Sequence, residues 1–69
     1  MHTKIWLIEQ SAKIGEHHTT IRGAARAKTR RKARERAGEA IRQATAQIDP
    51  QGIAELRGKP YVLYPITYE

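Results

Sequence analysis

The chain has 69 residues, with 13 lysines and arginines against 7 acidic residues and a formal net charge of +6. A chain this short forms one domain, residues 1–69, and buries only about 60% of its unfolded surface, so we expect a homodimer or another partner to add stability. The lack of cysteine excludes disulfides and thiolate metal sites, and no apolar run approaches the roughly 20 residues of a membrane span.

The first predicted strand is Lys4–Gln10, because bulky and β-branched side chains dominate it. Its apolar residues fall on both faces: Ile5 and Leu7 on one, Trp6 and Ile8 on the other. One helix can cover only one face of a sheet. We therefore expect the other face to carry an exposed apolar patch, with Trp6 as a candidate interface residue.

A turn at Ser11–Glu16 is predicted to connect this strand to a second strand, His17–Ala24, because Gly15 can take a positive φ. Gly23 is expected to end the second strand or to mark a bulge. The two histidines that open the strand point to opposite faces, so the pair does not predict a metal site, and no cofactor is expected.

A long helix is predicted over Thr29–Gln47, with Thr29 as its N-cap. Small and apolar residues recur at helical spacing and form one stripe: Ala33, Ala37, Ala40, Ile41, Ala44 and Ile48. Because most of this stripe is alanine, the axis of the helix can lie close to the sheet.

Basic residues gather at the start of this helix, and only one acidic residue interrupts them. The candidate anion- or partner-binding residues are Arg22, Arg26, Lys28, Arg30, Arg31, Lys32, Arg34 and Arg36. A helix N-terminus disfavours cations by about 0.3–1 kcal/mol each at exposed positions. Their concentration there favours a site for phosphate or carboxylate. The alternative is a solvated face that only keeps a small protein soluble.

Two structures are possible for Asp49–Gly58. We prefer a short helix that starts at Asp49; the alternative is a turn at Asp49–Gly52 followed by a short strand, Ile53–Arg57. The chain closes with a predicted strand at Lys59–Glu69. Pro65 within it indicates an edge position or a bulge.

These elements predict an α+β fold: a small, mainly antiparallel sheet, made of a β-hairpin and the C-terminal strand, packed on one long helix. The element order is ββα, then a short helix or strand, then β. The closing strand contributes Tyr64 and Tyr68 as candidate interface aromatics, beside Trp6. Tyrosines of this kind can stack on bases or form a protein interface.

A strand, a glycine turn, a threonine-rich second strand and the spacing Thr29-x₃-Ala33-x₃-Ala37 resemble the plan of many small phage and mobile-element proteins. Some anti-CRISPR proteins share this ββα plan, and the resemblance covers Lys4–Ile41. It implies a stoichiometric inhibitor that occupies a nucleic-acid path or a subunit surface on a host complex. It transfers no functional residue to this chain.

The sequence therefore predicts a non-enzymatic binding protein. There is no cysteine, Ser11 is the only serine, and no glycine-rich phosphate loop is present. The first hypothesis is a phage-type, anti-CRISPR-like inhibitor that docks on a host protein or nucleoprotein complex. The alternative is direct, sequence-nonspecific binding of DNA or RNA phosphates. No secretory signal is visible, so we expect the cytoplasm, that of the host cell if the chain is phage-encoded.

Overall fold

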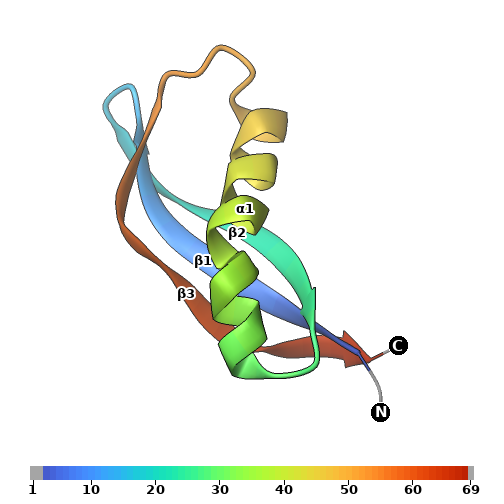
Figure 1. Ribbon diagram of the computed structural model, residues 1–69. Coiled ribbons are helices and arrows are strands. Elements are labelled where there is room, and N and C mark those ends of the chain that lie inside the picture. Colours follow the sequence, from blue (N-terminus) through green and yellow to red (C-terminus); the bar gives the residue numbers. More distant parts are fainter. Residues whose placement is uncertain (1–2, 69) are drawn as a thin grey trace.

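The computed structural model describes residues 3–68, and of Tyr68 only the backbone. Its elements are β1 (Lys4–Ile14), β2 (His17–Ala27), α1 (Arg30–Ile48) and β3 (Ala54–Tyr68). The strands form one antiparallel sheet in the order β2-β1-β3, and α1 lies across one face of it (Figure 1). The predicted α+β fold and its element order are confirmed.

The molecule is elongated, with principal extents of 43 × 20 × 17 Å. The β1–β2 turn and the α1–β3 connection lie toward one end, and the start of α1 lies at the other end with the start of β1 and the end of β3 (Figure 1). The candidate cations at the helix start are therefore far from the tip of the hairpin.

The hairpin is longer than the sequence predicted. Gly15, with a φ of +62°, makes the turn as expected, but β1 continues to Ile14 and β2 to Ala27. Every second residue from Trp6 to Ala12 is buried, so the strand alternation continues through Gln10. The prediction ended β1 too early because a polar residue and an alanine occupy the last buried positions.

Trp6 belongs to the core, so the prediction that it lies on the open face as an interface residue is wrong. Its indole is only 5% exposed, and the indole N–H donates to the carbonyl of Ala27 at 2.9 Å. The face that α1 covers is thus the one that holds Trp6 and Ile8. The core consists of Trp6, Ile8, Ala12, Ile21, Ala25, Ala27, Ala33, Ala37, Ala40 and Ile41.

Gly23 lies in the middle of β2 and neither ends the strand nor marks a bulge there. A Cβ atom at this position would come within 2.8 Å of the carbonyl oxygen of Ala40 and 3.5 Å of the Cβ of Ala44. The missing side chain therefore allows α1 to approach the sheet closely, as its alanine stripe predicted.

We expect Gly23→Ala to destabilise the fold by about 1–3 kcal/mol, because the new methyl group would push α1 away from the sheet. Urea unfolding followed by circular dichroism measures this change. Gly38→Ala is the matched control: nothing lies within 4 Å of its added Cβ, so the free energy of unfolding should rise by about 0.4–1 kcal/mol. Equal stability of Gly23→Ala and the parent would contradict this account of the packing.

The segment after α1 is a turn followed by a strand, so the preferred short helix is wrong and the alternative is confirmed, except that the strand begins at Ala54 and is continuous with the closing strand as β3. Asp49 is the C-cap of α1, and the N–H of Gly52 donates to its carbonyl at 3.0 Å. The carboxylate of Asp49 accepts hydrogen bonds from the N–H groups of Ile53 at 3.1 Å and Ala54 at 2.7 Å. These contacts turn the chain directly into β3.

β3 is an edge strand with an irregular register against β1. Gln10 lies between the pairs Glu9–Tyr61 and Ser11–Arg57, so it faces a bulge in which Gly58 has a φ of +68°. The buried amide of Gln10 donates to the carbonyl of Gly58 at 3.0 Å and fixes this bulge. Another register shift lies on each side of the position where Trp6 pairs with Pro65, which confirms the edge position and irregular pairing that Pro65 indicated.

Candidate anion-binding surface

The helix begins as predicted. Thr29 has extended backbone angles, and its hydroxyl accepts a hydrogen bond from the N–H of Lys32 at 3.3 Å. The first turn contains the cations Arg30, Arg31 and Lys32 and no acidic residue, although the N-terminal end of a helix favours anions. The local electrostatics of this turn therefore suit an incoming anion.

Arg30 has a structural role that the sequence did not indicate. Its guanidinium donates to the carbonyl of Val62 at 2.6 Å and to that of Leu63 at 2.7 Å. The same group lies 5.2 Å from the centre of the Trp6 ring, which adds a cation–π interaction. Arg30 thus links the start of α1 to β3 and covers the core tryptophan, so it is less available to a ligand than its neighbours.

Arg22 and Arg26 lie on β2, away from the outer surface of the helix. The register places both on the open face of the sheet, opposite Glu9 and Ile5 respectively. The guanidinium of Arg22 forms an ion pair with Glu9 at 2.5 Å, with its side chain 66% exposed. The structure therefore does not bring all eight candidate cations onto one surface.

Two candidate cations of α1 have partners close by. The guanidinium of Arg36 donates to the main-chain carbonyl of Arg26 and holds the helix against the end of β2. The ammonium of Lys32 lies 3.5 Å from the carboxylate of Glu35, an exposed pair that contributes little to stability. Lys32 can exchange this weak contact for a stronger anion.

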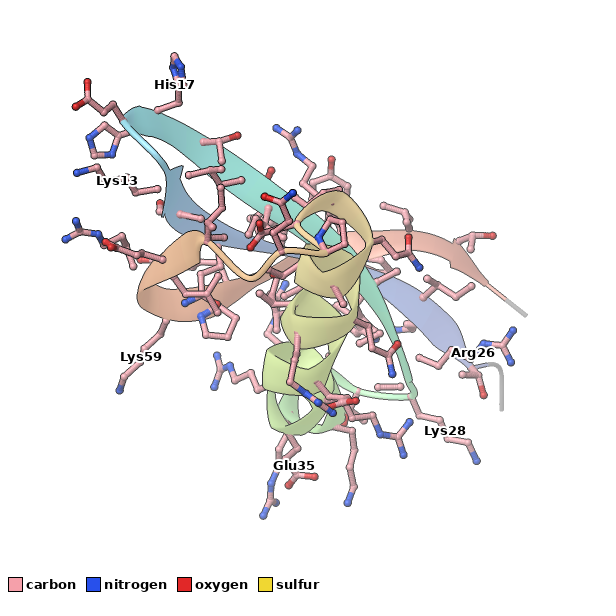
Figure 2. The ribbon with its side chains drawn as sticks, turned by 90° about the horizontal axis from the view of Figure 1, so that it is seen from above. Lys13, His17, Arg26, Lys28, Glu35 and Lys59 are labelled. Carbon is pink, nitrogen blue, oxygen red and sulfur yellow. The ribbon has the colours of Figure 1, made fainter. Side chains whose placement is uncertain are left out.

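Lys28, Arg31 and Arg34 are exposed, and their side chains form no hydrogen bond or ion pair with residues of the described range 3–68. Figure 2 shows Lys28 beside Arg26 at the end of the molecule opposite Lys13. We call Lys28, Arg31, Lys32 and Arg34 the helix-start surface. It is the part of the predicted site that the structure leaves open to a partner.

In the second half of α1, the basic residue Arg42 has an acidic partner, Glu39. Arg42 donates to Glu39 at 2.8 Å, and this hydrogen bond holds the pKa of the Glu39 carboxyl below its usual range. The same bond raises the pKa of the Arg42 guanidinium. Because this cation is matched by an acid, the open positive charge of the helix lies in its first half, as predicted.

Two further cations, which sequence reasoning missed, lie near Arg34. A groove of about 600 Å³ lies at the bulge of edge strand β3. Its lining residues are Ser11, Arg34, Arg57, Gly58, Lys59, Pro60, Tyr61 and Val62. Arg57 and Lys59 stand more than 20 residues after the cationic run in the sequence, and the path of β3 beside β1 brings them into the same lining as Arg34, with Arg57, opposite Ser11, on the open face of the sheet.

Of the two interface tyrosines predicted on β3, the structure describes the side chain of only one. Tyr64 is 56% exposed, as an interface residue would be, and the side chain of Tyr68 lies outside the described residues. Tyr61, which was not a candidate, is 72% exposed and lines the groove beside Lys59. The exposed aromatic surface therefore lies on β3 alone and not on Trp6.

No helix within residues 3–68 combines the length and the apolar character that crossing a bilayer requires. Over the same residues, no three potential ligands among histidine, aspartate and glutamate gather to hold a metal ion. Comparison with models of protein families, with curated proteins and with solved structures found no match for this chain.

Proposed function

We propose that this chain is a non-enzymatic binding protein whose helix-start surface binds the phosphates of a nucleic acid. The observation that carries the proposal is the set of exposed cations with open hydrogen-bonding capacity around the first turns of α1. Arginine and lysine in such positions bind phosphate oxygens through charge-assisted hydrogen bonds. The net charge of +6 would steer a polyanion toward the molecule.

The surroundings of these cations favour phosphates over an acidic protein. Protein interfaces usually depend on buried aromatic or aliphatic anchors at their centre. Within the described range, the large apolar side chains that are exposed all lie at or after residue 48: Ile48, Ile53, Leu56, Tyr61, Tyr64 and Ile66. The residues of the helix-start surface offer charge and no apolar anchor of their own; the exposed side chains of β3 lie beside the first turn of α1, where Arg30 binds the carbonyls of Val62 and Leu63. Charge of this kind suits a phosphate backbone.

Salt dependence tests this proposal. A labelled DNA duplex and labelled single strands of DNA and of RNA are titrated by fluorescence anisotropy. If the four cations of the helix-start surface each contact one phosphate, affinity should fall roughly 100-fold between about 50 and about 200 mM salt. Absence of binding to both DNA and RNA at the lower salt concentration would overturn the proposal.

A second candidate is an inhibitor that docks on a host protein or nucleoprotein complex in the cytoplasm, in the manner of anti-CRISPR proteins. The observation that favours it is the exposure of Tyr64 at 56% and Ile66 at 51% on edge strand β3. Such side chains can anchor a protein partner. A pull-down from host lysate treated with nuclease distinguishes the two: a protein captured by the parent but not by Tyr64→Ala would support the inhibitor.

A further inference from the structure

We propose that the open face of the sheet, opposite α1, binds a single-stranded nucleic acid, with a phosphate held by Ser11, Thr20 and Arg57 and a base on the ring of Tyr61. This inference goes beyond the proposed function, because it assigns a second surface that shares no residue with the helix-start surface. The partner is a strand with unpaired bases, since the bases of a duplex stay stacked inside it and cannot reach a protein ring.

The register of the sheet brings the phosphate-binding residues into one row. Every second residue of β1 from Trp6 to Ala12 is buried on the side of α1, so Ser11 points to the open face. Residues directly opposite each other in an antiparallel pair share a face. Ser11 pairs with Thr20 on β2 and with Arg57 on β3, and all three are exposed. Each of the three strands therefore contributes one side chain to the row.

An open cavity of about 420 Å³ is lined by this row. Its lining residues are Ser11, Ala12, His18, Thr19, Thr20 and Arg57. None of them belongs to α1 and none is acidic. Hydroxyl groups and guanidinium groups are common donors to phosphate oxygens, and the planar guanidinium can bind two oxygens at once. The chemistry of the cavity therefore matches a phosphate.

The donors of this cavity have no strong partner inside the protein. The hydroxyls of Ser11 and Thr20 form no hydrogen bond with residues of the described range 3–68. The guanidinium of Arg57 lies 3.7 Å from the carboxylate of Glu55, an exposed pair that contributes little to stability. A phosphate can thus gain these contacts without breaking a strong internal one.

The bulge of β3 holds Arg57 and Tyr61 in place. Between these two residues β3 carries three residues, where β1 has only Gln10. The amide of Gln10 donates to the carbonyl of Gly58 at 3.0 Å and lies 3.5 Å from that of Arg57. Since Gln10 is buried at 6% exposure, these contacts fix the bulge before any ligand arrives.

Tyr61 lies in the next row of the open face, opposite Glu9. Neighbouring rows on one face are about 7 Å apart, so a base whose phosphate occupies the cavity can reach the ring, which is 72% exposed. Glu9 is already paired with Arg22 at 2.5 Å, and its charge is therefore matched before a strand arrives. Nucleobases stack on exposed tyrosine rings without strong sequence preference.

Titration of the protein with labelled oligo-dT tests the proposal, with fluorescence anisotropy for the affinity and ¹⁵N spectra for the site. Oligo-dT should shift the amide signals of residues 57–61. Tyr61→Leu should weaken oligo-dT binding about 5- to 100-fold through lost stacking, while Tyr61→Phe, which keeps the ring, should bind like the parent. Neither change should alter the affinity for a duplex.

Arg57→Gln should weaken oligo-dT binding about tenfold or more, because a charge-assisted contact is lost. Arg42→Gln is the matched control, since it removes the same charge from α1, on the other face of the sheet, and should weaken binding only slightly. Circular dichroism verifies that every variant is folded.

The proposal is overturned if Tyr61→Leu binds oligo-dT as tightly as Tyr61→Phe, or if Arg57→Gln loses no more affinity than Arg42→Gln. Inorganic phosphate that binds as tightly as oligo-dT would also overturn it, because the base would then contribute nothing. If duplex binding still depends on Lys28 and Arg31 in these cases, the proposed function stands and only the open-face site fails. Tyr61-dependent binding of oligo-dT without that dependence would support the open-face site and overturn the helix-start surface.

Discussion

Trp6→Ala should destabilise the protein by about 3–5 kcal/mol, which would leave most of a 69-residue chain unfolded at room temperature. The substitution removes the largest core side chain, its hydrogen bond to Ala27 and the ring over which Arg30 lies. Urea unfolding followed by circular dichroism measures the loss, and parent and variant are compared at equal concentration.

Tyr64→Ala is the control for the removal of an aromatic ring. Tyr64 is 56% exposed, so its loss should change the free energy of unfolding by no more than about 0.5 kcal/mol. Trp6→Phe keeps most of the apolar volume but cannot donate a hydrogen bond to Ala27. Its free energy of unfolding should therefore lie between those of Trp6→Ala and Tyr64→Ala. If Trp6→Ala were as stable as Tyr64→Ala, Trp6 would not be a core residue, and the interface role predicted from the sequence would apply.

Replacing Lys28 and Arg31 together with glutamine should weaken binding to a DNA duplex about 100-fold or more, because two charge-assisted phosphate contacts are lost. The slope of log affinity against log salt should also become shallower by about 1.8, since each contact adds about 0.9. Both side chains are exposed and form no ion pair within residues 3–68, so folding should be unchanged. Fluorescence anisotropy over a salt series measures both quantities.

Lys13→Gln with Arg42→Gln is the matched control, because it removes the same charge from positions outside the helix-start surface. Lys13 lies near the hairpin tip, at the end of the molecule opposite Lys28 (Figure 2), and Arg42 pairs with Glu39. This control should reduce affinity only slightly through the lower net charge. Equal losses in the two double variants would show that the protein attracts DNA by overall charge and not through the helix-start surface.

The fold was largely predictable because its strongest signals are local. The alanine stripe and the Thr29 cap defined the helix, and Gly15 defined the hairpin turn. The segment after Asp49 was mispredicted because Asp-Pro can begin either a helix or a type I turn. In the structure Asp49 bonds to the N–H groups of Ile53 and Ala54, and Ala54 begins the pairing of β3 with β1, a long-range contact that the local sequence does not indicate.

The candidate site was predictable only in part because a run of charge does not reveal partners. Arg30 and Arg31 are neighbours in the sequence, yet one binds two carbonyls of β3 and the other is open to solvent. Arg57 and Lys59 carried no signal of their own, since they enter the groove lining that also contains Arg34 only through the path of β3. Trp6 was misplaced because β1 is apolar on both faces and the sequence does not say which face a helix covers.

The irregular register of β3 also limits self-association of this protein through its edge strand. An outer strand with exposed Tyr64 and Ile66 would, if flat, act as a template on which further copies add and grow into fibrils. Pro65, between these two side chains, cannot donate to a neighbouring ladder, and the shifts at Trp6 and Gln10 interrupt the flat surface that such growth needs. Edge strand β3 can therefore expose apolar side chains without promoting the open-ended addition of further copies.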